Sequence, residues 1–491
     1  MILWALKEQN RPFRFGFTCF SVACRMCRSL LTEQAENRRG LNQKCGETVL
    51  SSVFVGSNRK IDPSRRVHLK PDGTPDLNDR VEIGPTKLAF SEWEQAGLCV
   101  PDLPSLRHYR LSRLQQQVSA YDCAGLLLFD PLNIRYATDT TNMQLWIAHN
   151  AARACFVPPT GKVILFDFHN CEHLSAHLPL VGEVRGGASF FYFETGNRTD
   201  EHAAAFAGQI RDLMREYGGN NRRLAVDKIE NAGYRALQTK GVQILDGQVL
   251  SEHARSIKDE NELKAMRCAV HACERAVDEM RLAVQPGVTE NDVWAELHAG
   301  NIRRGGEWIE TRILASGPRT NPWFQECGPR VMQAGDMLAF DTDLISTYGY
   351  CCDISRSWIV GDLPPNDQQK HLYQVAYDHV MTNIELLKPG MSFSEVTAKA
   401  HRLPAAFRPL RYGVLAHGIG LCDEYPSIRY PEDAKHHGYD GCLEQGMTLC
   451  VEAYVGAEGG HEGVKLEEQI VITATGAEPL SSYPYETALM A

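Results

Sequence analysis

Several features that would define a protein class at once are missing from this sequence. No apolar run approaches the ~20 residues that a membrane-spanning helix requires, so we expect no membrane partner. The net charge of −10 at pH 7 argues against a nucleic-acid partner. The 16 cysteines are irregularly spaced. The C-x2-C pair of Cys24 and Cys27 is not followed by a second such pair, which argues against a zinc knuckle. Free thiols in a reducing cytosol are the simpler interpretation.

The composition that remains is that of a globular chain with several domains. Apolar residues make up 43% and charged residues 23% of the 491 residues, and this length allows two or three domains. Residues 1–50 mix arginine with phenylalanine and hold few acids. We predict an extension outside the fold, either a targeting segment or an over-long start of translation. Residues 51–105 are polar and contain several prolines, and we expect them to wrap the surface.

The next part of the chain, residues 106–250, alternates between strand and helix patterns. Buried strands are predicted at 125–130, 162–168 and 222–228, and helices at 109–121 and 202–217. Alternating strands and helices predict a layered α/β domain.

Residues 251–491 open on longer helical patterns. A helix is predicted to start near Lys258 and to end at Pro286, and a second to follow from Thr289 as its N-cap. Two further helices are expected at 368–387 and 392–401.

Three aspartates surround a predicted hairpin between the second and third of these helices. Asp341 and Asp343 are two residues apart, so a strand would place both carboxylates on one face. Turn residues follow, and a second strand would bring Asp353 back to the same space. Like charges this close raise each other's pKa and destabilise a fold, whereas a pair of divalent metal ions would neutralise them. The alternative is three solvated aspartates around a turn.

Further potential ligands lie downstream. Glu452 and Glu467 each occur within an apolar, β-branched run, where an unpaired carboxylate is costly to bury, and His417 precedes them in AHGIGL. Five carboxylates and one imidazole suit divalent Mn, Fe, Co or Zn, and a shared carboxylate can bridge two such ions about 3.5–4 Å apart. The predicted ligand set is Asp341, Asp343, Asp353, His417, Glu452 and Glu467.

The order of these motifs resembles the pita-bread metallopeptidase family, which includes creatinase, prolidase and aminopeptidase P. The resemblance rests on the GY-x-x-D segment at 349–353, the HGIG segment at 417–420, the GVKLE segment at 463–467 and the PLNIRYATD phrase at 131–139. It implies an α+β fold with a creatinase-like α/β N-terminal domain and a curved antiparallel sheet that encloses two metal ions. It also implies a cytoplasmic homodimer in which the partner's N-terminal domain helps to close the pocket.

The chain departs from the peptidases of this family at the groups that handle a peptide bond. Their two additional histidines are missing, because no histidine lies between His298 and His371, and Glu424 stands seven residues after His417. Asp343 occupies a position where the peptidases usually have a small residue. A prolidase-like hydrolase that uses Glu424 in place of histidine, with a salt bridge as the other role for Glu424, and a non-catalytic binding module remain alternatives.

The altered pattern resembles the peptidase-like dimethylsulfoniopropionate (DMSP) lyases of the same family. That resemblance implies a carbon–sulfur lyase that splits a small zwitterion into dimethyl sulfide and acrylate, with Asp423 as general base and Tyr412 in the substrate site. Metal assistance fits the chemistry, since a proton next to a carboxylate is very weakly acidic. Aromatic faces can hold a sulfonium cation. The candidates, each of which could instead be core, are Trp146, Trp323, Tyr412 and Tyr425.

Overall fold

The computed structural model describes residues 59–60 and 84–490, all of which belong to one compact unit, Gly56–Ala491. The predicted extension at 1–50 and most of the predicted surface segment lie outside the described residues. Their targeting role and the expected cytoplasmic location therefore stay predictions. Among the described helices, none combines the length and the apolar character needed to cross a bilayer.

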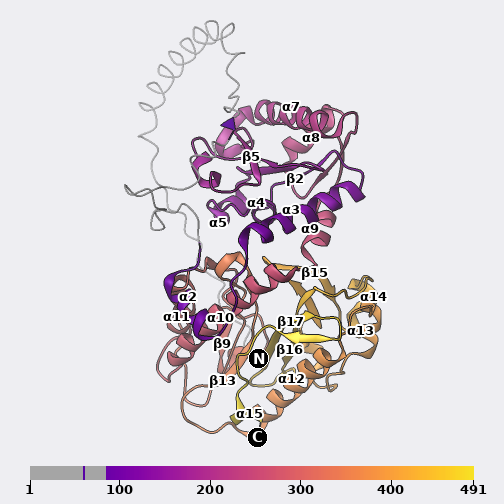
Figure 1. The fold of residues 1–491 in the computed structure, drawn as a ribbon. Helices are drawn as coiled ribbons and strands as arrows, with labels where there is room; N and C mark the ends of the chain where they lie inside the picture. The colour runs from indigo at the N-terminus through magenta and orange to yellow at the C-terminus, as the bar shows by residue number, and fades with distance from the viewer. Residues whose placement is uncertain (1–58, 61–83, 491) are drawn as a thin grey trace, which may run out of the picture. The chain divides into compact units, whose positions relative to one another are not determined.

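The N-terminal part is a mixed sheet covered by helices on both faces, as the alternation of patterns predicted (Figure 1). Alternate residues of β2 separate the two faces, since Leu126 and Leu128 pack in the cluster that contains α3, while Leu127 packs with the apolar side of α7. The strand order is β1(Arg59–Lys60), β5(Val181–Arg185), β4(Val163–Phe166), β3(Ala154–Val157), β2(Gly125–Leu128), β6(Arg223–Val226), β7(Gln243–Asp246). The helices are α3(Leu103–Ala120), α4(Pro131–Thr138), α5(Gln144–His149), α6(Tyr192–Thr195), α7(Thr199–Gly218), α8(Asn231–Thr239) and α9(Gln248–Arg255).

The C-terminal part packs helices against antiparallel sheets, which confirms the predicted α+β pita-bread class. The largest sheet has the order β15(Asp423–Ile428), β14(Ala416–Ile419), β16(Thr448–Val455), β17(Val464–Ile472), β18(Ala477–Pro479). Two three-stranded sheets accompany it: β13(Arg356–Ile359), β10(Met337–Phe340), β9(Leu314–Ser316), and β12(Cys351–Cys352), β11(Leu344–Ile345), β8(Trp308–Ile309). The helices are α10(Glu260–Leu282), α11(Glu290–Arg303), α12(Asp367–Leu386), α13(Phe393–Lys399) and α14(Pro431–His437).

Caps define where the long helices begin. The Asp259 carboxylate accepts a hydrogen bond from the Glu262 amide at the start of α10, and Thr289 forms a capping box with Asp292 at the start of α11. Both starts lie within two residues of their predicted positions.

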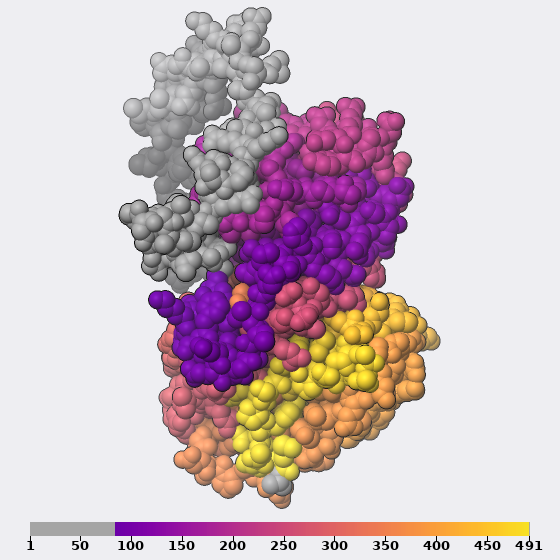
Figure 2. All heavy atoms as spheres, in the orientation of Figure 1, coloured from indigo at the N-terminus to yellow at the C-terminus, as the bar shows by residue number. Residues whose placement is uncertain are grey.

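The segment before the N-terminal domain is anchored to the C-terminal domain. The indole of Trp93, in α2(Lys87–Gln95), is buried and donates a hydrogen bond to the Cys268 carbonyl of α10. Arg110 of α3 pairs with Glu262 of α10. In Figure 2 the indigo surface accordingly runs from the N-terminal domain onto the C-terminal domain.

One strand prediction was wrong. β10 ends at Phe340, and Asp341 and Asp343 lie in the break between β10 and β11 rather than on a strand. Asp343 has φ of +36°, a left-handed conformation that interrupts the pleat. The two carboxylates therefore converge through a turn of the backbone and not through the two-residue period of a strand.

A buried ion cluster joins the two domains. The Glu424 carboxylate is fully buried and accepts from Arg255 Nε at 3.0 Å and from the Lys258 ammonium. The Arg255 guanidinium also donates to the Asn133 side chain of α4 and to Glu252. Of the two roles left open for Glu424, the geometry favours the salt bridge, because both of its oxygens are engaged.

Glu424→Gln should destabilise the protein strongly. The substitution leaves the buried Lys258 without its counter-charge and Arg255 with only the partly exposed Glu252, and breaking a buried ion pair costs ~3–5 kcal/mol. The free energy of unfolding, measured in urea, reports the loss. The exposed Glu444→Gln is the matched control and should change stability by less than ~0.5 kcal/mol. Equal effects of the two substitutions would contradict a structural role for the cluster.

Candidate metal centre and cleft

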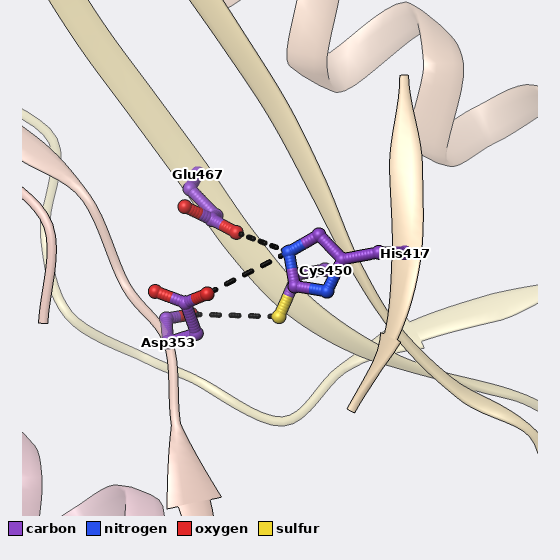
Figure 3. A group of neighbouring side chains, drawn as sticks. All are labelled: Asp353, His417, Cys450 and Glu467. Carbon is purple, nitrogen blue, oxygen red and sulfur yellow. Dashed lines mark hydrogen bonds and ion pairs between the residues drawn. The ribbon is translucent and has the colours of Figure 1, made fainter. Parts of the chain in front are cut away.

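The six predicted ligands converge from five places in the chain. Strands β14, β16 and β17 carry His417, Glu452 and Glu467, and the two glutamates are directly opposite each other in the antiparallel register. The aspartates enter from the ends of β10 and β12. His417 Nε2 lies 3.3 Å from Glu467 Oε1 and 3.6 Å from both Asp353 Oδ2 and Glu452 Oε1. Figure 3 shows Asp353 and Glu467 directed toward this imidazole, and the sulfur of Cys450 joined to Asp353.

Unsatisfied buried oxygens indicate that these residues fit a metal. Oδ1 of Asp353, both carboxylate oxygens of Glu452 and Oε1 of Glu467 are buried without a hydrogen-bond partner among the described residues. Potential ligand atoms form two groups, one of Asp353, His417, Cys450 and Glu467, the other of Asp341, Asp343 and Asp353, with the atoms of each group within 4.8 Å of one another. Asp353 belongs to both groups. Many oxygens with one imidazole suit a divalent transition metal.

Electrostatics in this space are governed by burial and mutual repulsion. Burial raises the pKa of Asp353 and of Glu452 well above their usual values, and the charge of Glu467 adds to both shifts. Burial opposes protonation of His417, yet the carboxylates around it hold its pKa well above the usual range. The pKa of Glu467 is lowered despite its burial, because Lys465 and His417 are adjacent. Without a metal, the raised pKa values thus favour protons on the carboxylates of Asp353 and Glu452 and on the imidazole of His417, and a bound metal would displace these protons.

Two residues at the centre were missed by sequence reasoning, and both were detectable. Cys450 is two residues before Glu452 on β16, and its Sγ lies 3.8 Å from the Asp353 carbonyl oxygen. Lys465 is two residues before Glu467 on β17 and contacts three of the predicted ligands. Strand alternation places each on the same face as its glutamate.

The HGIG segment brings a neighbouring strand very close. A Cβ atom at Gly418 would lie 2.3 Å from the Tyr425 carbonyl oxygen, and one at Gly420 would lie 2.6 Å from the Glu424 carboxylate. Only glycine allows β15 to approach β14 in this way. The approach places Asp423 Oδ1 3.6 Å from Nδ1 of His417.

A cleft of about 780 Å³ opens over His417 and Asp423. The Asp423 side chain is 57% exposed there, on the ring side opposite the nitrogen that faces the carboxylates. Partial burial by the cleft raises the pKa of Asp423, and His417 opposes that shift. The walls are formed by α9 and by aromatic rings, and they include Gln248, Glu252, His253, Phe324, Tyr412, Tyr425 and Tyr439.

Not all predicted aromatic residues reach the cleft. Tyr412 and Tyr425 line it. Trp323 is 6% exposed and stacks on Tyr454 at 5.7 Å, so the wall position belongs to its neighbour Phe324, which is 62% exposed and lies 5.3 Å from the Tyr412 ring. The difference arises because Phe324 has φ of +69°, which turns its side chain away from that of Trp323.

Trp146 lies in α5 of the N-terminal domain and does not line the cleft of its own chain. Its ring contacts Phe168 and Phe191. A substrate role for Trp146 would therefore require a second chain.

Comparison with known proteins identifies the family. The model of metallopeptidase family M24 matches residues 264–474, and that of the creatinase/prolidase N-terminal domain matches residues 110–257. The chain is 55% identical over 437 residues to the dimethylsulfoniopropionate lyase DddP of Roseovarius nubinhibens, covering 88% of this chain and 98% of that protein. The chain belongs to the DddP family. A second DddP, from Roseobacter denitrificans, is 53% identical with the same coverage of both chains.

Solved structures agree with the fold. An Xaa-Pro dipeptidase from Bacillus anthracis superposes with a TM-score of 0.61 over 77% of this chain and 98% of that chain, at 23% identity. A likeness at this identity supports the creatinase-like and pita-bread architecture alone.

Proposed function

We propose that this protein is a DMSP lyase, which cleaves dimethylsulfoniopropionate to dimethyl sulfide and acrylate by metal-assisted β-elimination. The observation that carries the proposal is Asp423, an exposed carboxylate in the cleft beside the buried ligand set. Sequence identity above one half to two DddP proteins supports the same activity.

The proposed cofactor is a pair of divalent transition-metal ions, such as Fe, Zn, Mn or Co, held by the six predicted ligands. Asp353 belongs to both groups of ligand atoms, and this sharing supports two ions rather than one. A bound pair would supply Lewis-acid stabilisation to the carboxylate end of the substrate.

The residues of the cleft can carry out proton removal and substrate binding. We assign Asp423 as the base that takes the proton next to the substrate carboxylate. The C–H electron pair becomes the C=C bond of acrylate, the C–S bond breaks, and dimethyl sulfide leaves as a neutral molecule. Partial burial raises the pKa of Asp423, which strengthens it as a base.

The sulfonium end of the substrate requires an aromatic surface. Tyr425 stacks on Tyr439 with ring centroids 5.7 Å apart, and Phe324 and Tyr412 form a second pair. Both pairs line the cleft, and a cation over such faces gains ~0.5–2 kcal/mol.

The peptidase alternative has less support. Glu424, which would have to replace the missing histidine, is fully buried and paired with Arg255 and Lys258. The alternative of a non-catalytic module is disfavoured because all six predicted ligands are present and lie together. Purified protein supplied with DMSP should release headspace dimethyl sulfide, whereas an X-Pro dipeptide should yield no proline; the reverse result would favour the peptidase.

Metal analysis tests the cofactor. The purified protein should contain about two transition-metal ions per chain, and Glu467→Gln should lower this count because the group of ligand atoms around His417 loses a carboxylate. Elemental analysis by plasma mass spectrometry gives the count. The neighbouring Glu468 pairs with Arg356 on the other face of β17, so Glu468→Gln should keep the metal and is the control. A metal-free wild-type protein that was never exposed to chelator would refute the proposed cofactor.

Asp423→Asn tests the base. It preserves shape but removes the basic oxygens, so kcat for dimethyl sulfide release should fall at least ~10²-fold, with metal content and thermal stability nearly unchanged. The rival base is the Tyr412 hydroxyl, whose pKa burial raises far above its usual value. Tyr412→Phe should therefore retain more activity than Asp423→Asn. If Tyr412→Phe loses more activity than Asp423→Asn, Tyr412 is the base instead of Asp423. If both variants keep full activity, neither residue is the base.

We also propose a homodimer, supported by an apolar surface on the N-terminal domain. Tyr192 and Phe193 of α6 are each 78% exposed, and Met143 and Leu145 at the start of α5 are more than half exposed. The rings of Trp146, Phe191 and Phe193 connect the two helices. An exposed apolar patch of this kind is typical of an interface, and a second copy would bring Trp146 toward the partner's cleft.

Replacing both Tyr192 and Phe193 with serine should convert the dimer into a monomer. Light scattering at micromolar concentration measures the mass. Tyr234→Ser removes an exposed aromatic residue on α8, outside the patch, and should leave the dimer intact. A monomeric wild-type protein would rule out the homodimer.

A further inference from the structure

A lysine occupies the side of the metal centre opposite His417. Lys465 has 0% exposure, and its ammonium lies 2.6 Å from Glu467 Oε2, 2.9 Å from Asp341 Oδ2 and 3.0 Å from Glu452 Oε2. It also donates to the Ser355 hydroxyl, which in turn donates to Asp341 and Glu467. In the described chain, no other lysine or arginine side chain pairs with a predicted ligand carboxylate.

The oxygens of the two glutamates are divided between the two nitrogen groups. Oε1 of Glu452 and Oε1 of Glu467 face the imidazole of His417, while Oε2 of each faces Lys465. Each outer oxygen thus lies against the ammonium, as a hydrogen-bonded ion pair in Glu467 and as an ion pair alone in Glu452, and each inner oxygen is directed toward the centre. Those inner oxygens are among the buried atoms without a hydrogen-bond partner.

The charges of the ligands and the metal ions also indicate a role for Lys465. The five ligand carboxylates carry five negative charges when ionised, and two divalent ions supply four positive charges. One negative charge would remain in a space that excludes water, where an uncompensated charge is costly. The ammonium of Lys465 supplies the missing charge.

We propose that Lys465 is a positioning residue of the metal centre: it fixes the outer oxygens of Glu452 and Glu467 so that their inner oxygens converge on the metals, it holds Asp341 through Oδ2, and its charge completes their neutralisation. This inference rests on the proposed metal centre and is independent of the lyase reaction. Lys465 also lies 4.6 Å from the centroid of the Tyr412 ring, so the same cation packs against the wall of the cleft.

The two possible roles of Lys465 predict changes of opposite sign in metal affinity when the residue is replaced, so a measurement of affinity distinguishes them. If Lys465 acted only as a nearby positive charge, its removal would strengthen metal binding, because like charges repel. If it orients the ligands, removal weakens binding, as the loss of outer hydrogen-bond partners typically costs 10–100-fold in metal affinity.

The experiment is titration of chelator-treated, full-length protein with Mn²⁺ in a calorimeter. Lys465→Met should weaken Mn²⁺ binding roughly 10–100-fold, and Lys465→Arg, which retains charge and donors, should recover most of the affinity. Lys465→Gln keeps hydrogen-bond donors without the charge and should fall between them. It also tests the proposal if the methionine variant does not fold.

A buried cation elsewhere provides the control. Arg153 is fully buried and pairs with Asp167 in the N-terminal domain at 3.0 Å, so Arg153→Met removes a comparable ion pair without touching the centre. Its Mn²⁺ affinity should equal that of the wild type. Tighter or unchanged binding by both Lys465→Met and Lys465→Gln would overturn the proposal, as would an equal loss in Arg153→Met. Failure of the wild type to bind Mn²⁺ would refute the metal centre itself and the proposal with it.

Discussion

Repulsion between buried carboxylates is the constraint on which the catalytic domain depends. Asp341, Asp353, Glu452 and Glu467 are almost completely removed from water, and burial raises the pKa of most of them. A fold that gathers such groups must supply positive charge at fixed positions. The chain provides His417 on one side and Lys465 on the other, and the unsatisfied oxygens between them leave room for metal ions.

Sequence reasoning succeeded where chemistry and periodicity agreed. Glu452 and Glu467 could be recognised because a carboxylate inside a β-branched run is costly unless it binds something. The strand alternation that made these glutamates recognisable also places Cys450 and Lys465, each two residues earlier, on the same strand face. Neither residue was identified from the sequence. A lysine among apolar residues is normally taken as surface-exposed, because lysine is almost never fully buried unless it is paired.

The failures concern backbone geometry that a residue pattern does not encode. Asp341 and Asp343 converge because β10 ends early and Asp343 adopts a positive φ, and Phe324 takes the wall position predicted for Trp323 for a similar local reason. Trp146 has a different cause: its position depends on the N-terminal domain, and a role in the cleft would depend on a second chain. Spacing alone contains no information about such distant contacts.

Consecutive residues on β15 point to opposite sides of the strand, and this links the strand segment that carries Asp423 to the N-terminal domain. Asp423 faces the cleft, while Glu424 is fastened to Arg255 of α9, which in turn reaches Asn133 of α4. The point at which the N-terminal helices are attached to β15 therefore lies one peptide unit from the proposed base. A substitution at Asn133, which does not line the cleft, would therefore change the support of the strand that carries the proposed base without replacing a cleft residue.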